Sequence, residues 1–467
     1  MNTAIPISLV KKKEYEDYVN REKLPLLRLD STYLLNLKVY SYIVQQAENN
    51  KIDVFSIEGI GKLRKGQEKI GGVKALGIMV KSIAKLTIHP LKLEVKSVSQ
   101  SSLVNPCNIA IISTGIGSIG RSGIVPRFFH KLIEDFFDEK LPVSVTQHVV
   151  RFELEREDVS PYYIIALLNS FYGRMLIEGI ATYGATGQLE VHIPILSKLK
   201  VPIVDIQNKV AETIMEALEE YESKAWRAYF KAMKIVEEYL GKVNLTIAGT
   251  AKLETVKMVN RIDSSVLLAY SVLAEIAKLL KAFTKTLGEL FTIIPGNVPW
   301  SSEYIGKTGV PYIGINAIDD SGIVDEEKLD YMSPSLLKPS FRRAKSGEVL
   351  LVKDGSKAGK AGMVNEPLFV RQGICILKPR YSENDSYYIL SILKSKLYQQ
   401  VFRLLTYGSA QPHLSSKTIE ELPIILLESR NEIAINMKEF VENMYRANAR
   451  KKQAIMELEN YILKLLS

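Results

Sequence analysis

Two segments of the chain repeat their apolar positions at alternating spacings of four and three residues, with no internal proline. Such spacing places an apolar stripe along one face of a helix and is typical of a coiled-coil seam. The stripes consist of Ile214, Leu218, Tyr221, Ala225, Ala228, Ala232, Ile235 and Tyr239 in the first segment, and of Ile433, Met437, Phe440, Met444, Ala447, Lys451, Ala454, Leu458, Tyr461 and Leu465 in the second. The pattern predicts two long helices that pair as an antiparallel coiled coil, roughly 57 Å long at 1.5 Å per residue.

The rest of the chain has a different pattern. Short runs of β-branched residues alternate with Gly/Pro turns and a few helical stretches, which predicts an α+β fold. With the two helices this gives four parts: a first α+β domain at 1–205, a central helix at 206–245, a second α+β domain at 246–427 and a C-terminal helix at 428–467.

The first half of the sequence recurs in the second half. The matched landmarks are RLDS (28–31) with RIDS (261–264), GIGSIGRSGIV (115–125) with DGSKAGKAGMV (354–364), YYIIALLNS (162–170) with YYILSILKS (387–395), Tyr183-Gly184 with Tyr407-Gly408, and LKVPIVDIQNKVAE (199–212) with ELPIILLESRNEIAI (421–435). Their offset stays between 223 (431 − 208) and 238 (355 − 117) residues. A constant order at a nearly constant offset indicates an internal repeat, so we expect two copies of one α+β domain.

Composition narrows the class of protein. With 24% charged and 46% hydrophobic residues the chain is typical of a soluble globular protein. The most apolar helical segment (264–283) carries charged residues at helical spacing, which predicts no membrane span. The N-terminus has no signal-peptide pattern, and Cys107 and Cys375 lie in apolar runs, where we expect buried free thiols. A cytoplasmic protein follows as the expectation, and its net charge of +9 favours polyanionic partners mildly.

The two glycine-rich stretches do not satisfy the spacing of nucleotide-binding loops. A P-loop needs four residues before its Gly-Lys and then Ser or Thr, whereas Gly355 and Gly359 enclose three residues and Ala361 follows Lys360. GIGSIG (115–120) matches the dinucleotide motif in letters, but the following RSGIVP cannot open the helix that takes the pyrophosphate. We therefore expect no bound nucleotide, and interpret both stretches as one structural turn used twice.

Motifs of other enzymes are also missing. The stretches closest to the catalytic tetrapeptide of DNA methyltransferases, NPCN (105–108) and SPYY (160–163), both lack the second proline, and the second reads better as a helix N-cap. The histidines stand singly, at 89, 130, 148, 192 and 413, so the sequence predicts no metal site. The sequence argues against a catalytic chain that binds its own cofactor.

The ordered landmarks resemble those of the specificity subunit of type I restriction–modification systems. Each half has an Arg-[Leu/Ile]-Asp-Ser, a Gly-Ser-x-x-Gly-basic turn between strands, a strand headed by Gln, the YYI helix, a loop ending in Gln and a strand that leads into the long helix. The resemblance covers nearly all 467 residues. The first half departs from the pattern in an insertion around 127–143 and in Val201-Pro202 at the last strand.

This resemblance implies a non-catalytic subunit. Each α+β domain would be a target recognition domain that reads one half of a two-part site in double-stranded DNA. The helices would set the gap between the halves and dock two methyltransferase subunits, which carry the S-adenosylmethionine. Restriction subunits would then join and use ATP and Mg²⁺.

The candidate DNA-binding residues lie in the repeated turns and loops. We expect glycine-rich turns to bring backbone N–H groups and the basic side chains close to phosphate, and glutamine to pair with adenine and Arg371 with guanine. The candidates are Ser118, Arg121, Gln147, His148 and Gln188 in the first half, and Ser356, Lys357, Lys360, Arg371, Gln372, Gln411 and His413 in the second.

Other charged residues have a structural interpretation. We read the pairs Arg28/Asp30 and Arg261/Asp263 as fixing domain edges, and Arg446, Arg450, Lys451 and Lys452 as a solvated helix face or a methyltransferase contact. Two further functions stay open, namely a divergent stand-alone methyltransferase or nuclease and a coiled-coil scaffold. The first would bind S-adenosylmethionine or metal by itself, and the second would not be retained on DNA.

Overall fold

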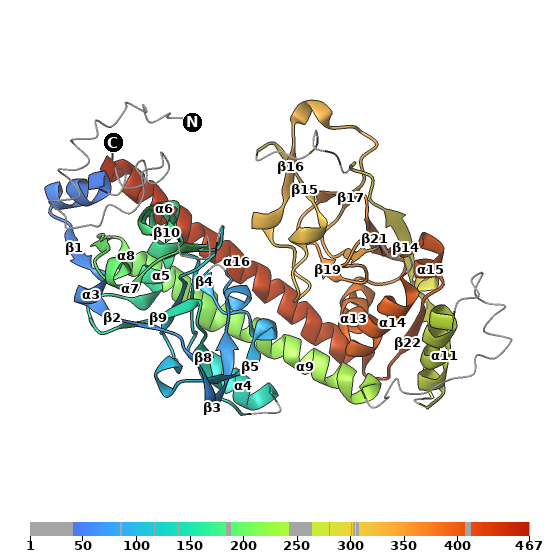
Figure 1. The fold of residues 1–467 in the computed structure, drawn as a ribbon. Helices are drawn as coiled ribbons and strands as arrows, with labels where there is room; N and C mark the ends of the chain where they lie inside the picture. The colour runs from blue at the N-terminus through green and yellow to red at the C-terminus, as the bar shows by residue number, and fades with distance from the viewer. Residues whose placement is uncertain are drawn as a thin grey trace. The chain divides into compact units, whose positions relative to one another are not determined.

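The computed structural model describes residues 41–84, 86–115, 117–137, 140–183, 188–241, 264–279, 281–299, 301, 304, 308–406 and 412–466 (Figure 1). The chain divides into two compact units. The first comprises Met1–Ser223 and Arg446–Ser467, and the second Lys224–Tyr445. Among the residues singled out from the sequence, Arg28, Asp30, Arg261, Asp263 and Gln411 lie outside the described residues.

The first unit is built on a five-stranded sheet. Its order is β2 (Gly61–Lys65), β9 (Val149–Leu154), β6 (Ile109–Ile112), β7 (Ser122–Ile124) and β4 (Leu86–Thr87). The buried side chains of β6 and β9 pack against the apolar helices α5 (Pro161–Asn169) and α6 (Phe171–Ile180) in one hydrophobic core. A smaller sheet has the order β5 (Glu94–Val98), β3 (Glu68–Ile78) and β8 (Val143–Val145). The insertion expected around 127–143 contains the helix α4 (Phe129–Phe136).

The second unit repeats this topology. Its main sheet has the order β14 (Phe291–Pro295), β21 (Ile374–Pro379), β18 (Val349–Val352) and β19 (Ala361–Met363), which matches β2-β9-β6-β7. Its other sheet has the order β16 (Asp330–Met332), β15 (Val310–Ile313), β20 (Leu368–Val370) and β17 (Arg343–Ala344). Each of these second sheets contains one parallel pair, β3 with β8 in the first unit and β15 with β20 in the second. The two copies of one α+β domain predicted from the repeat are confirmed.

Short elements complete the two units. In the first unit they are α3 (Ile57–Ile60), β10 (Thr182–Tyr183), β11 (Leu189–Glu190), α7 (Ile193–Leu196) and the 3₁₀ turns Val80–Ser82, Pro90–Lys92 and Gln100–Ser102. In the second they are α11 (Ser264–Leu279), α12 (Leu287–Leu290), α15 (Ser416–Glu420) and the 3₁₀ turns Ile315–Ala317, Glu326–Lys328 and Pro334–Leu336. Across the described ranges, no helix is both long and apolar enough for a membrane crossing.

Each unit is closed by pairing its first strand with its last. Strand β1 (Asp53–Ser56) is antiparallel to β12 (Lys200–Ile203), and β13 (Phe283–Thr286) is antiparallel to β22 (Pro423–Leu426). A buried tyrosine of the YYI helix fixes the end of the last strand. The Tyr388 hydroxyl donates to the Ile425 carbonyl at 2.7 Å and accepts from the Leu427 amide at 3.0 Å. Tyr163 makes the same two contacts, with the Pro202 carbonyl and the Val204 amide.

The helix pairs that carry these tyrosines have side-chain caps. In the first unit Ser160 caps α5, as expected, and Ser170 caps α6. In the second, α13 (Glu383–Lys394) starts at its cap Ser382, three residues before the position that the alignment with Ser160 suggested, and α14 (Lys396–Leu405) is capped by Ser395. Ser170 and Ser395 each follow the last residue of one helix and cap the next, because their hydroxyls accept a hydrogen bond from an amide in its first turn. The angle between the two helices is thereby fixed.

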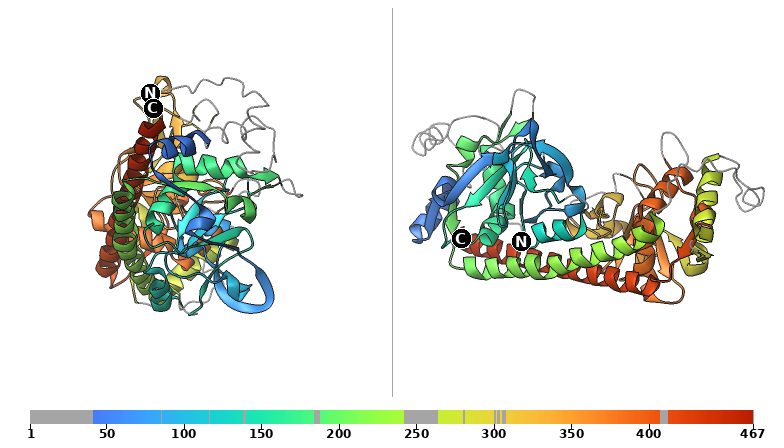
Figure 2. Two further views of the ribbon diagram at one scale, coloured as in Figure 1. Left: turned by 90° about the vertical axis from the view of Figure 1, so that its left-hand side faces the viewer. Right: turned by 90° about the horizontal axis from the view of Figure 1, so that it is seen from below.

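The two long helices pair antiparallel within each unit. In the first unit, α8 (Gln207–Met215) and the π-helical stretch Glu216–Glu222 lie against the C-terminal half of α16 (Arg430–Leu466), with Lys209 Nζ 3.0 Å from a Glu457 oxygen. In the second, α9 (Ser223–Leu240) lies beside the N-terminal half of α16 (Figure 2), where the Tyr229 and Phe440 rings pack with centroids 4.9 Å apart and planes tilted by 59°. Residue numbers rise on one helix as they fall on the other, which confirms the predicted orientation.

Two details of the seam differ from the prediction. The sequence placed Ile235 and Tyr239 on the stripe, but Val236 and Leu240 are the buried residues at this end of the helix. Lys451 is only 9% exposed and pairs with the buried Glu222 at 3.7 Å, so the prediction of a solvated face is wrong for this residue. Removal of either residue would leave the other as an unpaired buried charge, which is costly. The pair therefore favours the alignment of the two helices in which Lys451 lies opposite Glu222.

The two cysteines differ in exposure. Cys375 lies in β21 and is fully buried, and burial raises the pKa of its thiol to about 11. Cys107 lies in the turn before β6 at φ +67° and is only half-buried, so the expectation of a buried strand thiol is wrong for Cys107. Both are free, as expected.

Tyr388→Phe tests the closure of the second unit. The variant leaves the Ile425 carbonyl and the Leu427 amide unpaired in the core, so we expect unfolding to require about 1–3 kcal/mol less free energy. Urea unfolding of the full chain, followed by circular dichroism, measures the change. Tyr381→Phe is the matched control, because Tyr381 is 73% exposed and its loss should change stability by less than about 0.5 kcal/mol. Equal midpoints for the two variants would contradict the role of Tyr388.

Candidate nucleic-acid interface

Three segments of the first unit meet at one end of its main sheet. The Ser113 amide and hydroxyl both donate to the His148 carbonyl, at 3.0 and 3.1 Å. The Gly115 amide donates to the Leu189 carbonyl at 2.9 Å. The turn between β6 and β7, the residues before β9 and the segment that contains β11 therefore form one surface. We refer to residues 113–121, 146–148 and 188–191 as the first rim.

The second unit has an equivalent surface. The Lys353 amide donates to the Gly373 carbonyl at 2.8 Å, and the Gly355 amide donates to the Pro412 carbonyl at 2.8 Å. The β18–β19 turn, the residues before β21 and the residues before α15 thus come together in the same way. We refer to residues 353–360, 371–373 and 412–414 as the second rim. The sequence predicted candidate residues in each of these segments, and the structure brings them side by side.

The turn glycines are required by packing and by backbone conformation. Gly120 and Gly359 have φ +77° and +91°. A Cβ at Gly120 would lie 3.0 Å from the Ile177 side chain of α6, and one at Gly359 would lie 2.6 Å from the Phe402 side chain of α14. Each turn is therefore seated directly on a helix, which holds the exposed part of the rim in place.

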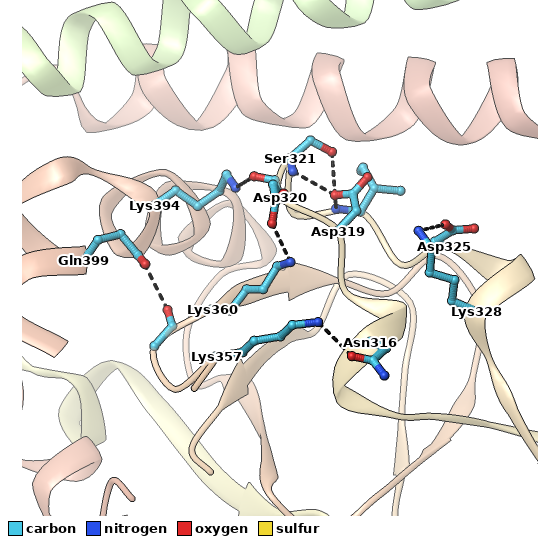
Figure 3. A network of polar contacts seen from close by, with 12 residues as sticks. Asn316, Asp319, Asp320, Ser321, Asp325, Lys328, Lys357, Lys360, Lys394 and Gln399 are labelled. Carbon is cyan, nitrogen blue, oxygen red and sulfur yellow. Dashed lines mark hydrogen bonds and ion pairs between the residues drawn. The ribbon is translucent and has the colours of Figure 1, made fainter. Parts of the chain in front are cut away.

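The basic side chains of the second rim are held by neighbouring loops (Figure 3). Lys357 donates to the Asn316 side chain at 2.7 Å, and Lys360 pairs with Asp320 at 2.6 Å. The Asp320 carbonyl also accepts from Lys394, and burial lowers the pKa of that lysine to about 8. Lys360 is thus half-buried in an ion pair, whereas Lys357 is exposed and donates to a neutral amide.

The predicted residues fall into two groups by exposure. The exposed side chains, which face solvent at the rims, are Gln147, His148, Gln188, Ser356, Lys357 and Gln372. The half-buried ones are Ser118, Arg121, Lys360, Arg371 and His413. In the first rim the Gln147 amide nitrogen lies 3.3 Å from the His148 ring nitrogen, so the two polar side chains are adjacent on the surface. Exposed amides carry both a donor and an acceptor and can pair with a base edge.

Besides Lys360, two other half-buried candidate residues have acidic partners. The Arg371 guanidinium is 3.4 Å from an Asp330 oxygen, with 14% of its side chain exposed. The His413 ring pairs with the Asp354 carboxylate. A base contact by Arg371 would compete with Asp330, so guanine recognition by this residue stays a prediction.

The second unit matches a known family of DNA-recognising domains. Residues 281–457 match the family described as "Type I restriction modification DNA specificity domain". This part of the chain therefore contains a DNA specificity domain of type I restriction–modification systems. The first unit repeats the same strand order and has an equivalent rim, so the chain contains two copies of one domain fold. Members of this family are the non-catalytic specificity component of type I restriction–modification systems, which confirms the predicted class of function.

Solved structures of similar proteins include specificity subunits. The S subunit of a type I restriction–modification system from M. genitalium is 18% identical over 90% of this chain and 97% of its own, with a TM-score of 0.40. The HsdS subunit from Thermoanaerobacter tengcongensis is 14% identical over 89% and 95%, with a TM-score of 0.27. A structure of type I restriction–modification complex assembly gives 14% identity over 89% and 96% and a TM-score of 0.29. The curated protein sequences gave no match. These superpositions are weak, and the family assignment rests on the domain match.

Sequence reasoning missed several residues near the rims. Asn316 and Asp320 position the two lysines of the second rim, but they lie in a loop that no repeated motif marks. A basic stretch beside the first rim, at residues 62–74, was also missed, although a local count of charge would have found it. Within the described part of the chain, no cluster of three or more potential metal ligands occurs.

Gly359→Ala tests whether the turn must sit on α14. The added Cβ would clash with Phe402 and force the second rim outward, so we expect a loss of stability of about 1–3 kcal/mol and weaker DNA binding. Thermal unfolding and DNA-binding titrations of the full chain measure both effects.

Gly355→Ala is the matched control for this substitution. Gly355 also has a positive φ, +82°, but no atom lies within 4 Å of its added Cβ. It should show only the backbone strain of about 1–2 kcal/mol. If Gly359→Ala behaved like Gly355→Ala in both measurements, the seating of the turn on α14 would not matter for the rim.

Proposed function

We propose that this specificity subunit reads a two-part site in double-stranded DNA, with one part read by each rim. The observation that supports the proposal is the convergence, in both units, of three separate segments on one end of the main sheet. Each rim combines exposed hydrogen-bonding side chains with backbone amides of a glycine turn. Side chains specify bases, whereas amides and cations fix the position on phosphate.

The two rims differ in chemistry, which supports an asymmetric site. The first rim offers Gln147, His148 and Gln188 from its exposed segments. The second offers Gln372 on one segment and Ser356 with Lys357 on the turn. Since the repeated scaffold is the same and the exposed groups are not, each rim would select a different base sequence.

The long helices supply the rest of the proposed role. Strands β12 and β22, which close the units, lead directly into α8 and α16. A continuous helical spacer would set the number of base pairs between the two parts of the site. Because the two units repeat one fold, each would offer a similar surface to a partner protein. Two such surfaces would bind two methyltransferase subunits, which carry S-adenosylmethionine. Restriction subunits that use ATP and Mg²⁺ would complete the assembly. This chain would bind none of these cofactors itself.

Single glutamine substitutions in each rim test the two-part reading. We expect Gln147→Ala to relax one part of the methylated motif and Gln372→Ala to relax the other, because removing a hydrogen bond to a base costs about 1–3 kcal/mol of discrimination at one position. Each full-length variant is co-expressed with its methyltransferase subunit, and methylated adenines are mapped by sequencing. Gln45→Ala, at an exposed helical position outside the rims, is the control. A motif unchanged by both rim variants, or altered in the same part by both, would overturn the proposal.

Lengthening the helices tests the spacer role. Seven residues inserted after Ser223 and seven after Tyr445 add one heptad to each helix and keep the seam in phase. The added length of about 10 Å corresponds to about three base pairs at 3.4 Å each. We expect the unspecified gap in the methylated motif to grow by that amount with both parts retained. An unchanged gap in a folded, active variant would show that the helices do not set the spacing.

A further inference from the structure

The positive charge of the chain is concentrated in one stretch of the first unit. Residues 61–98 contain nine Lys or Arg residues and two Glu residues, so nine minus two leaves +7 of the total +9. This stretch forms β2, β3 and β5. A polyanion is attracted by the charge close to it and not by the net charge of the whole chain. This stretch is therefore a strongly basic region of a chain whose total charge is small.

Four of these cations have no carboxylate partner. Arg64, Lys65, Lys69 and Lys74 are exposed, and among the described residues no carboxylate lies within ion-pair distance of them. Other lysines of the stretch do form ion pairs, namely Lys62 with Glu155, and Lys81 and Lys96 with Glu94. The four cations without a carboxylate partner all lie within residues 61–74, which we name the basic arm.

The basic arm ends in a fixed, apolar tip. Glu68 and Val73 both lie opposite Val98 in the β3–β5 ladder, so the four residues between them leave the ladder. The Ser97 hydroxyl donates to the Lys69 carbonyl at 2.7 Å. A Cβ at Gly72 would lie 2.3 Å from the Val98 carbonyl, which makes glycine necessary for this approach. The tip projects Ile70, whose side chain has a relative exposure of 102%.

The basic arm adjoins the first rim. The Gly66 amide donates to the Val149 carbonyl at 3.0 Å. A Cβ at Gly66 would lie 2.3 Å from the Thr146 carbonyl, and Gln147 is the next residue. In Figure 2 the blue β3 segment projects at the edge of the first unit. The exposed cations and Ile70 thus continue the surface of the first rim.

We infer that the basic arm is a second DNA contact of the first unit, beside the base-reading rim. Arg64, Lys65, Lys69 and Lys74 neutralise phosphates, and Ile70 makes an apolar contact in the groove. Such contacts position the duplex, because phosphate contacts carry no sequence information. The fixed tip supports an inserted side chain, since little conformational entropy is lost when it binds.

This inference rests on the proposed function, since it assumes that the first rim binds duplex DNA. A single exposed isoleucine would mean nothing alone. Its setting among four unpaired cations favours DNA over an apolar protein partner, because a protein surface of mixed charge would not need four unpaired positive groups. An apolar wedge flanked by Lys and Arg is a known means of holding DNA in its groove.

The charges are tested with two matched double variants of the full chain. Lys65→Gln with Lys69→Gln removes two charges from the basic arm. Lys51→Gln with Lys198→Gln removes two exposed charges beside the closing strands β1 and β12. Binding to a fluorescent mixed-sequence duplex of about 30 base pairs is followed by anisotropy between about 50 and 200 mM KCl. We expect the slope of log K against log salt to fall by about 1.8 for the basic-arm variant, because each phosphate that a lysine neutralises contributes about 0.9 to the slope. The slope of the control variant should stay unchanged.

Ile70→Ala tests the apolar contact separately. Because Ile70 is fully exposed, the substitution should leave the thermal midpoint unchanged. We expect about tenfold weaker binding, equivalent to about 1.4 kcal/mol, with an unchanged salt slope. Because Ile70→Ala changes no charge, weaker binding with the same salt slope would be due to the lost apolar contact and not to phosphate contacts of the lysines.

The outcomes distinguish this inference from the proposed function. If the unaltered chain binds the duplex with a steep salt dependence but the basic-arm and control variants give equal slopes, the basic arm is not a DNA contact and the rims are unaffected. If the unaltered chain shows no salt-dependent binding, both the inference and the proposed function are wrong. If the slope falls as expected and Ile70→Ala binds like the unaltered chain, the phosphate contacts stand and the groove contact is wrong.

Discussion

The pairing of the first and last strands of each unit is the constraint on which the rest of the structure depends. It brings the start of each α+β domain against the strand that leads into a long helix, and a buried tyrosine hydroxyl locks that strand at both of its backbone groups. Because a buried carbonyl or amide is costly when unpaired, the strand end has little freedom. The direction in which each long helix leaves its unit is thereby fixed to the main sheet.

The same closure determines where the rims form. The YYI helix packs against the sheet, the helix after it supports the glycine turn, and the loop that follows returns to that turn before the closing strand. Three segments far apart in sequence are thus held at one end of the sheet by a continuous core. The rim can vary its exposed side chains without disturbing this core, which suits a family of domains that must read different sequences on one scaffold.

Electrostatics act differently in the two rims. In the second, Lys357 donates to Asn316 and Lys360 pairs with Asp320, so neighbouring loops hold the basic side chains of the turn. In the first, the charge lies beside the rim, on the strands β2 and β3. One unit would therefore contribute more to non-specific attraction than the other, although both share one topology. The difference arises from strands outside the repeated motifs, where the two halves have diverged.

The sequence by itself determined the repeat, the α+β class and the antiparallel helices, because these follow from local periodicity and from landmarks that recur in order. It also identified the segments of both rims, since repeated turns with glycine and glutamine stand out when two copies are compared. Only the tertiary structure decided which of those side chains are accessible. The partners of Arg371 and of the seam residue Lys451 are Asp330 and Glu222, and both come from distant segments that no spacing rule connects. The exposed tip at Ile70 was also undetectable in sequence, since an apolar residue in a strand is ordinarily buried, and only its departure from the ladder opposite Val98 places it in solvent.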